Sequence, residues 1–333
     1  MPKSLHYALV ICTYQRPASL RRLLGSVAQQ TRAFDSIWVI DASPQADHDL
    51  VGAFPQLPLH YHHALPHERG LTRQRNVGIN QAIPTSDFLF FLDDDVALAP
   101  DYVAHIDNVF TQYPQAIGVG GYIVNDVAWR STSTATRTNS TCYQADSWER
   151  NLPLRWRWRQ MLGLYPKAPA GRYDASGHPL GLGFIPPSGR VYPVDFIMGG
   201  ASSFRAQVFA KQRFSTYFEG YGLYEDMAFC LEVRKKGQIY LSTQARLSHF
   251  HDPNGRPPGF AYGQMVMRNG WLIWKSVYPN PTLNQMLRWH GTSWFLAFCL
   301  WAKPTQKSSW QQWAGRMWGW LSLYVQPPQW PTP

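Results

Sequence analysis

Residues 88–95 read Phe-Leu-Phe-Phe-Leu-Asp-Asp-Asp, and this stretch is the most informative part of the chain. Its five apolar residues are typical of a buried strand. The strand runs directly into three carboxylates, whose like charges repel unless solvent, protonation or a bound cation compensates them. Because oxygen ligands favour hard ions, the cluster predicts a Mg²⁺ or Mn²⁺ site that would also hold a diphosphate. A solvated acidic loop after a core strand is the alternative.

The composition is that of a folded protein with aromatic surfaces. The 333 residues are 45% hydrophobic and 16% charged, enough for one large core or two modest ones. The 15 Trp, 17 Tyr and 17 Phe suggest surfaces for sugars, lipids or a partner. The net charge of +10 implies attraction to polyanions, meaning nucleic acid, an anionic membrane or phosphorylated substrates.

The four cysteines are scattered without a C-x-x-C pair, which argues against a zinc ribbon or a disulfide framework. We therefore expect a reducing cytosol, and we recognise no signal peptide. The longest hydrophobic run, 294–302, is far shorter than the roughly twenty residues that span a bilayer. We expect no membrane crossing, although part of the chain could lie on a membrane.

The first half alternates short apolar runs with amphipathic segments, which is typical of β-α-β units in a largely parallel sheet. Strands are predicted at 7–12, 36–40, 58–62, 87–92 and 117–124, and helices from 17, over 71–82 and over 101–113. Catalytic loops gather at the carboxyl ends of such strands. Thr13, Asp41 and Asp93–Asp95 all occupy such ends.

The second half is less regular. Residues 126–193 are rich in Ser, Thr, Gly, Pro, Trp and Arg, and show weak periodicity. Beyond them we expect an ordered run at 191–198, a helix over 222–236, strands at 238–241 and 245–249, and helices over 258–277 and 283–301. A long irregular segment in a compact protein is usually functional or mobile.

The first expected strand ends in Cys-Thr-Tyr-Gln-Arg-Pro, residues 12–17. Thr13, Tyr14 and Arg16 supply a hydroxyl, an aromatic ring and a guanidinium, a set that suits a base and a pyrophosphate. A threonine ahead of a proline-led helix is equally a structural cap. Asp41, after the second strand, could accept hydrogen bonds from a base or ribose, or it could be a turn residue.

Three arginines lie near the expected helix start at residue 71. The segment 69–76 contains Arg69, Arg73 and Arg75, followed by Asn76. Arginine forks and helix-terminal N–H groups both hold phosphate. A solvated basic helix face is the alternative.

A second acidic pair, Glu225 and Asp226, precedes an apolar helical run. Such carboxylates can simply be favoured by the helix dipole, but Asp226 beside a substrate hydroxyl would be a general base. Further on, His249 and His251 fall on one face of an expected strand. One imidazole would complete an octahedral Mn²⁺ or Mg²⁺ shell, whereas a surface histidine pair is the alternative.

Together, these pieces resemble glycosyltransferase family 2, the large inverting family of nucleotide-sugar transferases with the GT-A fold. The resemblance covers roughly residues 5–260. Its motifs are V-I-C-T-Y-Q-R-P at 10–17, G-x-x-x-x-R-N at 70–76, F-L-D-D-D-x-x-x-x-P at 91–100, G-G-A-S-S-F-R at 199–205, E-D at 225–226 with L-E-V-R-K-K-G at 231–237, and A-R-L-S-H at 245–249.

The resemblance implies an α/β fold, a Rossmann-like mixed, mainly parallel sheet flanked by helices, with a C-terminal helical extension. It implies a catalytic domain over 1–257, with a nucleotide-binding half (1–125) and an acceptor half (126–257). The extension covers 258–333.

The resemblance also implies roles for single residues. Asp93–Asp95 would be the D-x-D motif, with Asp93 and Asp94 toward the donor, Asp95 and Asp93 on the metal, and His249 or His251 as a further ligand. Asp226, next to Glu225, would be the catalytic base. The nucleotide pocket would contain Thr13, Tyr14, Arg16, Asp41, Arg73, Arg75 and Asn76. Gly199 and Gly200 would let the backbone approach the donor sugar.

The expected activity is metal-dependent, inverting transfer of one sugar from a nucleoside diphosphate sugar, UDP first and dTDP next. The Q-x-x-R-W signature of processive synthases is missing, so we expect single transfer to a glycan or polyprenyl-linked acceptor, in cell-surface polysaccharide biosynthesis. The tail mixes Trp294, Phe298, Trp301 and other rings with cations such as Lys303, which is typical of a segment in a membrane interface, and we expect it at the cytoplasmic face. Packing of these rings against the catalytic domain is the alternative.

Two other classes of enzyme share parts of this pattern. A metal-dependent nucleotidyltransferase has a similar acidic strand end but releases pyrophosphate. A nucleic-acid-processing enzyme would explain the net charge, but it does not account for the acidic pair at 225–226, and we expect no nucleic-acid partner.

Overall fold

A computed structural model of the chain describes residues 5–132, 141–252, 254, 256–302 and 307–330. Contacts divide the chain into two compact units, one from 1–127 with 187–255 and one from 128–186 with 256–333. Residues 128–186 therefore group with the C-terminal helices, whereas the sequence-based division assigned them to the catalytic half. Lys303 lies outside the described residues.

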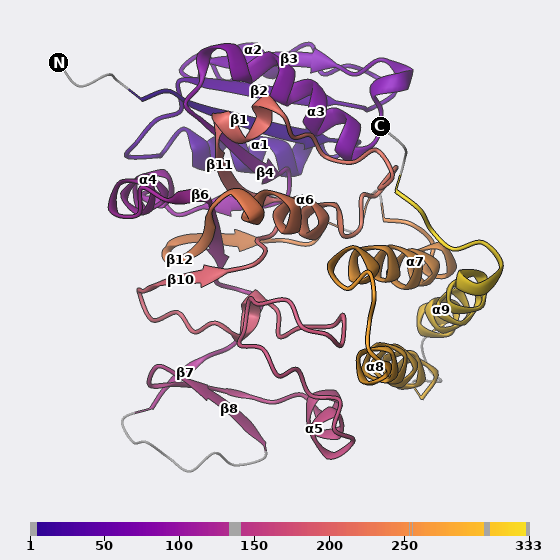
Figure 1. Ribbon diagram of the computed structural model, residues 1–333. Helices are drawn as coiled ribbons and strands as arrows, with labels where there is room; N and C mark the ends of the chain where they lie inside the picture. Colours follow the sequence, from indigo (N-terminus) through magenta and orange to yellow (C-terminus); the bar gives the residue numbers. More distant parts are fainter. Residues whose placement is uncertain (1–4, 133–140, 253, 255, 303–306, 331–333) are drawn as a thin grey trace. The chain divides into compact units, whose positions relative to one another are not determined.

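The first unit is an α/β unit built on one sheet (Figure 1). Its strands are β1 (Tyr7–Thr13), β2 (Ser36–Asp41), β3 (Leu59–His63), β4 (Phe88–Asp93), β5 (Val96–Leu98), β6 (Ala116–Ile123), β10 (Val191–Val194), β11 (Ala201–Arg205) and β12 (Gln238–His249). Its helices are α1 (Pro17–Val27), α2 (Leu50–Ala53), α3 (Leu71–Ala82), α4 (Tyr102–Gln112) and α6 (Glu225–Val233).

The sheet runs in the order β10-β12-β6-β11-β4-β1-β2-β3, and β5 pairs with β12 off this path. Strands β3, β2, β1 and β4 are parallel, as the alternation in the first half predicts. Strand β11, which the sequence did not reveal, runs antiparallel between β4 and β6. The two short strands expected at 238–241 and 245–249 are one strand, β12, with a register shift between Leu241 and Arg246.

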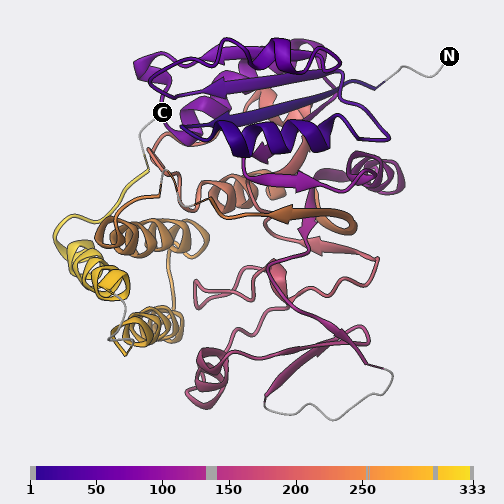
Figure 2. The ribbon, with the colours of Figure 1, turned by 180° about the vertical axis from the view of Figure 1, so that it is seen from behind.

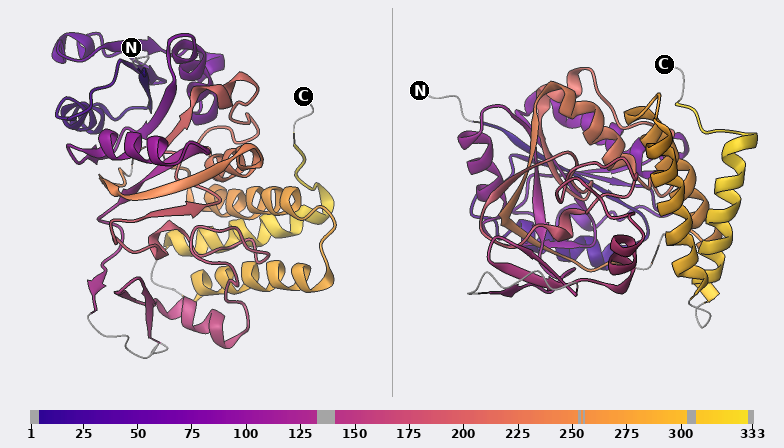
Figure 3. Two further views of the ribbon diagram at one scale, coloured as in Figure 1. Left: turned by 60° about the vertical axis from the view of Figure 1, so that its left-hand side comes forward. Right: turned by 60° about the horizontal axis from the view of Figure 1, so that its bottom comes forward.

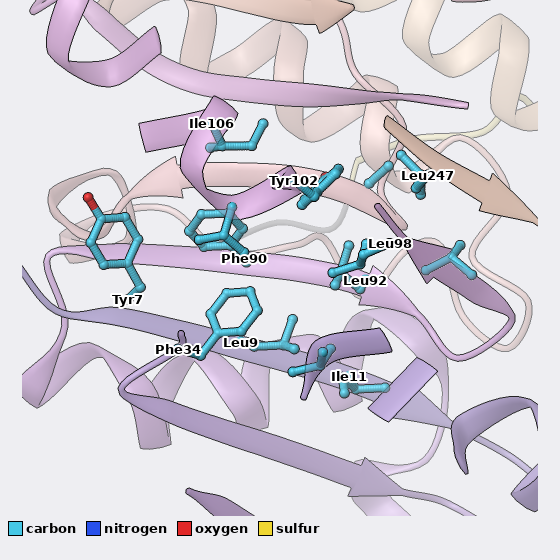
Figure 4. Close-up of a cluster of buried hydrophobic side chains, with 14 of the residues drawn as sticks. Tyr7, Leu9, Ile11, Phe34, Phe90, Leu92, Leu98, Tyr102, Ile106 and Leu247 are labelled. Carbon is cyan, nitrogen blue, oxygen red and sulfur yellow. The ribbon is translucent and has the colours of Figure 1, made fainter. Parts of the chain in front are cut away.

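Helices cover both faces of this sheet, which Figures 1 and 2 show from opposite sides. On one face, Leu9 and Phe90 are fully buried among side chains of α1 and α4, as the close-up of this core shows (Figure 4). On the other face, α3 packs against β1 and β2. Phe91 lies there too, within a cluster of rings that includes Phe229 of α6. The alternation of side chains along a strand explains why Phe90 and Phe91 serve different layers.

In its described residues, the second unit contains a small antiparallel sheet and four α-helices. These are β7 (Arg130–Ser131), β8 (Cys142–Ala145), β9 (Trp148–Asn151), α5 (Leu154–Met161), α7 (Gly259–Val277), α8 (Leu283–Trp301) and α9 (Lys307–Val325). The last three helices lie side by side (Figure 3). Within the described ranges, no helix is both long enough and apolar enough to cross a membrane.

Glycines bring α7 and α9 together. A Cβ on Gly263 would lie 2.1 Å from the carbonyl oxygen of Gln312, and one on Gly315 would lie 2.0 Å from that of Phe260. Both glycines belong to G-x-x-x-G runs, at 259–263 and 315–319. The two backbones therefore meet directly, since residues without side chains permit close approach.

A pair of glycine substitutions tests the packing of α3 on β1. A Cβ on Gly78 would lie 2.4 Å from Cγ1 of the buried Val10, whereas one on Gly25 of α1 would have no heavy atom of the described residues within 4 Å. We expect Gly78→Ala to lower the free energy of unfolding by about 1–3 kcal/mol. Gly25→Ala should raise it by about 0.5–1 kcal/mol. Denaturant unfolding measures both, and equal effects would contradict this packing.

Candidate active site

The carboxyl ends of the parallel strands bring the expected site residues to one edge of the sheet. Thr13 of β1 is in register with Asp41 of β2, and Cys12 is in register with Asp93 of β4. The chain turns at Asp94 and Asp95 and continues as β5. The acidic run is therefore a tight turn between two strands.

The short strand β5 connects this turn to the histidine segment. His249 of β12 is in register with Val96, which directly follows Asp95. As a result, Nε2 of His249 lies 3.1 Å from Oδ1 of Asp95, although 153 residues lie between them in the sequence. Burial lowers the pKa of His249, but the hydrogen bond and charge of Asp95 outweigh it, so the net pKa is raised. Burial likewise raises the pKa of Asp95, but His249 holds it below its usual value.

A divalent cation fits this corner. One donor atom from each of Asp93, Asp95 and His249 lies within 4.8 Å of the others, and two carboxylates with an imidazole suit Mn²⁺ or Mg²⁺. Nδ1 of His249 is buried without a hydrogen-bond partner among the described residues, and Nε2 pairs with Asp95. The ring also packs against that of His251, with the centroids 4.0 Å apart. A cation could therefore take the place of the proton shared by His249 and Asp95.

The side chains of Asp94 and Arg16 pair with each other and do not point freely into a nucleotide pocket. Asp94 accepts hydrogen bonds from Oγ1 of Thr13 at 2.7 Å and from Nη1 of Arg16 at 3.0 Å. The same guanidinium lies 3.8 Å from Asp95 and contacts the carbonyl oxygen of Asn254. Burial raises the pKa of Asp94 to about 6 against the opposing effects of Thr13 and Arg16. Their polar groups therefore hold the acidic turn, while the neighbouring Tyr14 is exposed.

Asp41 also has internal partners. It accepts hydrogen bonds from N of Ser43 and from the hydroxyl of Tyr61, each at 2.8 Å. These contacts agree with the interpretation of Asp41 as a turn residue. Its binding of a nucleotide base stays a prediction.

Arg75 connects the acidic pair Glu225–Asp226 to the acidic cluster Asp93–Asp95. Nη1 of Arg75 lies 2.6 Å from Oε1 of Glu225, and Nη2 lies 3.5 Å from Oδ1 of Asp93. Arg75 is 3% exposed, so this cation is held almost out of water. The strand end and the first turn of α6 are thereby joined.

The glycine pair Gly199-Gly200 makes room for this cluster. A Cβ on Gly199 would lie 2.6 Å from Nη1 of Arg75, and one on Gly200 would lie 2.1 Å from the carboxyl carbon of Asp93. In this structure the glycines therefore admit protein side chains. The expected approach to a donor sugar stays a prediction.

Asp226 is half-buried at the start of α6. Its Oδ2 accepts a hydrogen bond from N of Gly199 at 3.0 Å, and its Oδ1 accepts one from N of Met227 at 2.6 Å. Burial raises the pKa of Asp226 above its usual value against these two hydrogen bonds. Burial, aided by Asp226, raises the pKa of Glu225 to about 8, and Arg75 opposes this. The two carboxylates are thus made better proton acceptors than exposed ones.

Two further predicted site residues, Arg73 and Asn76, bind other parts of the protein. Arg73 binds the carbonyl oxygen of His67 and the carboxylate of Glu219. Asn76 uses both ends of its amide on the backbone of Phe214, donating at 2.8 Å and accepting at 3.0 Å. Their expected contacts to the nucleotide stay predictions, but these hydrogen bonds do not favour them.

His251 is paired with Asp126 at 2.8 Å rather than with the aspartates of the turn. With His249 it forms a second, more exposed group of possible ligands, Asp126, His249 and His251. The geometry thus distinguishes the two histidines that the sequence left equivalent.

Two residues escaped the sequence analysis. Gln74 is buried and donates to the carbonyl oxygens of Thr13 at 3.1 Å and Ile40 at 2.7 Å, so it ties the ends of β1 and β2. Asp252 donates its N–H to Asp95 at 2.8 Å and accepts from Oγ of Ser19 at 2.8 Å. The only signal for Gln74 was a polar residue on the inner face of a helix, and Asp252 directly follows His251.

Comparison with known proteins agrees with this architecture. Residues 8–167 match the family model described as Glycosyl transferase family 2. A glucosyl-dolichyl phosphate glucuronosyltransferase from Haloferax volcanii is 26% identical over 122 residues, which cover 36% of this chain and 38% of that protein. The match covers less than two thirds of that relative.

Two solved structures share the fold. S. aureus TarS aligns with a TM-score of 0.51 at 13% identity, over 93% of this chain and 47% of that one. GalNAc-T7, solved with UDP, GalNAc and Mn²⁺, aligns with a TM-score of 0.52 at 14% identity, over 91% of this chain and 58% of that one. The match of residues 8–167 and the shared architecture agree: the chain has the GT-A fold, and this part of it is similar to glycosyltransferase family 2.

Proposed function

We propose that this protein transfers one sugar from a nucleoside diphosphate sugar to a hydroxyl group, with inversion at the anomeric carbon. The observation that carries the proposal is the contact of the buried Arg75 with both Glu225 and the partly exposed Asp93. It joins a candidate donor and cation site to a candidate base, the two functions that a single displacement needs in one place.

Asp226 is the proposed base. Its two oxygens each accept one backbone hydrogen bond, which orients the carboxylate and leaves lone pairs for a substrate hydroxyl. The acceptor oxygen forms a bond to the anomeric carbon as its proton moves to Asp226. The bond from that carbon to the diphosphate oxygen breaks, and the nucleoside diphosphate leaves with the electron pair.

Asp93, Asp95 and His249 are the proposed cation ligands. When bound, Mn²⁺ or Mg²⁺ would neutralise charge on the departing diphosphate. Glu225 and Arg75 position Asp93 and the start of α6, so we assign Glu225 a positioning role. UDP is the favoured nucleotide and dTDP the next, and the solved GalNAc-T7 complex with UDP and Mn²⁺ supports this choice.

The proposed acceptor is a glycan or a polyprenyl-linked sugar, in cell-surface polysaccharide biosynthesis. The dolichyl phosphate in the name of the Haloferax volcanii relative supports a lipid-linked acceptor. Such an acceptor would place the protein at the cytoplasmic face of a membrane, where nucleotide sugars are available.

The first test is nucleotide binding. With UDP, dTDP, GDP and CMP, each with and without Mn²⁺, we expect one nucleotide to raise the melting temperature only when Mn²⁺ is present, because a ligand of the folded state stabilises it. Asp95→Ala should lose this shift, whereas Asp101→Ala, at an exposed carboxylate of the same unit, should keep it. If no nucleotide shifts the wild type with Mn²⁺, the proposed donor site is wrong.

The second test separates chemistry from binding. We expect Asp226→Asn to lower nucleoside diphosphate release from a UDP-sugar by at least about 100-fold, since an amide accepts no proton, while the nucleotide shift is retained. Glu232→Gln, an exposed carboxylate on the same helix, is the control. Near-normal turnover of Asp226→Asn would refute the base assignment. Release of pyrophosphate instead would indicate a nucleotidyltransferase.

The third test is pH dependence. A base works only when ionised, and burial raises the pKa of Asp226 above 3.8. Activity should therefore fall as the pH is lowered, and the loss should begin at a higher pH than for an ordinary aspartate. The acid limb of the kcat/KM profile measures this. A rate that stays constant down to pH 3.8 would contradict a buried carboxylate base.

A further inference from the structure

The positive charge of the protein belongs to the second unit. Residues 128–186 and 256–333 contain 15 Lys and Arg but three Asp and Glu, whereas 1–127 and 187–255 contain 16 and 18. Residues 256–333 hold seven Lys and Arg and no carboxylate. The side chains of residues 256–333 therefore carry no negative charge, and the charge of this unit favours a partner with negative charge.

Helix α8 presents a line of large apolar side chains to solvent. These residues recur at intervals of four, seven, four and three, which is the spacing of one helix face. Their exposed fractions lie between 43% and 75%. They are Leu283, Leu287, Trp294, Phe298 and Trp301.

Helix α9 continues this surface. It exposes Trp310, Trp318, Leu321 and Tyr324. The centroid of Trp301 lies 6.3 Å from that of Trp310, and Trp294 and Trp320 lie 5.0 Å apart. The rings of the two helices thus form one continuous aromatic face, which we call the α8–α9 face.

Helix α5 adds arginine to the same unit. Its sequence, Leu-Arg-Trp-Arg-Trp-Arg-Gln-Met at 154–161, exposes Leu154, Trp158 and Met161 on one side. Arg288 of α8 donates hydrogen bonds to the carbonyl oxygens of Gly163 at 2.9 Å and Tyr165 at 2.8 Å. The segment after α5 is therefore fixed to the helix that carries Leu287.

The chemistry of this face favours a lipid surface over a protein partner. Indole and phenol rings prefer the boundary between hydrocarbon and water. On α5 the exposed Arg155 and the partly exposed Arg157 lie next to Leu154 and Trp158 in the sequence, and such cations attract anionic headgroups. A helix with large apolar side chains along one exposed face suits a position in the plane of the interface. We propose that the α8–α9 face, with α5, seats the protein in the interface of a membrane rich in anionic lipid. The proposal supports a lipid-linked acceptor but rests on different observations from the catalytic site.

Vesicle sedimentation tests this assignment. We expect the full chain to sediment with phosphatidylcholine vesicles that contain phosphatidylglycerol, and about tenfold less with phosphatidylcholine alone. The double substitution F298E/W318E should weaken binding to the anionic vesicles by about tenfold or more, because it places charge where the rings would enter the interface. Both side chains are more than half exposed, so the fold should tolerate the change.

The control is V51E/L65E, which adds the same charge at exposed apolar residues of the first unit and should bind as the wild type does. Circular dichroism melting checks that each variant is folded. Wild type that stays in solution with anionic vesicles, or F298E/W318E that binds fully, would overturn the proposal. So would a wild-type dimer that F298E/W318E converts to a monomer in light scattering, because the face would then join two copies. Nucleotide-induced stabilisation is measured separately, so either proposal can fail alone.

Discussion

Arg75 is a buried cation between two carboxylates, and the rest of the candidate site depends on it. Glu225 and Asp93 come from a helix and a strand that lie far apart in the sequence, and the buried Glu225 would lose its cationic partner without this guanidinium. Removing one partner of a buried ion pair typically costs about 3–5 kcal/mol, because the other charge remains buried. Glycine is needed at 199 and 200 for these contacts. A Cβ at 199 would collide with Arg75 and Glu225, and one at 200 would collide with Asp93.

The charges of the three aspartates at the strand end are compensated in different ways. Asp94 binds Thr13 and Arg16, and Asp95 binds His249. The side chain of Asp93 is 36% exposed, and its Oδ1 lies 3.5 Å from Nη2 of Arg75. Two of the three charges are therefore compensated by the protein itself, which leaves Asp93 as the most open of the three carboxylates to a ligand.

The second unit is packed through glycine contacts between helices and through buried tryptophan rings. Its helices α7 and α9 approach through glycines, and its interior holds Trp274 and Trp289, which are almost fully buried. Trp274 donates its indole N–H to the carbonyl oxygen of Ala175, so the segment between α5 and β10 packs on the helices of this unit. With these rings inside, four tryptophans of α8 and α9 are exposed, namely Trp294, Trp301, Trp310 and Trp318. The aromatic richness of the sequence thus serves two purposes, a core and an exposed face.

The sequence by itself determined the parallel half of the sheet, the helices over 71–82 and 283–301, and the set of carboxylates, arginines and histidines at strand and helix ends. Periodicity and capping are local, so they can be read from neighbouring residues. Only the tertiary structure decided which of these groups meet: β5 brings His249, not His251, to Asp95, and Arg75, not Arg73, enters the acidic cluster. Strand pairing and burial act between residues far apart in the chain, and no local pattern records them.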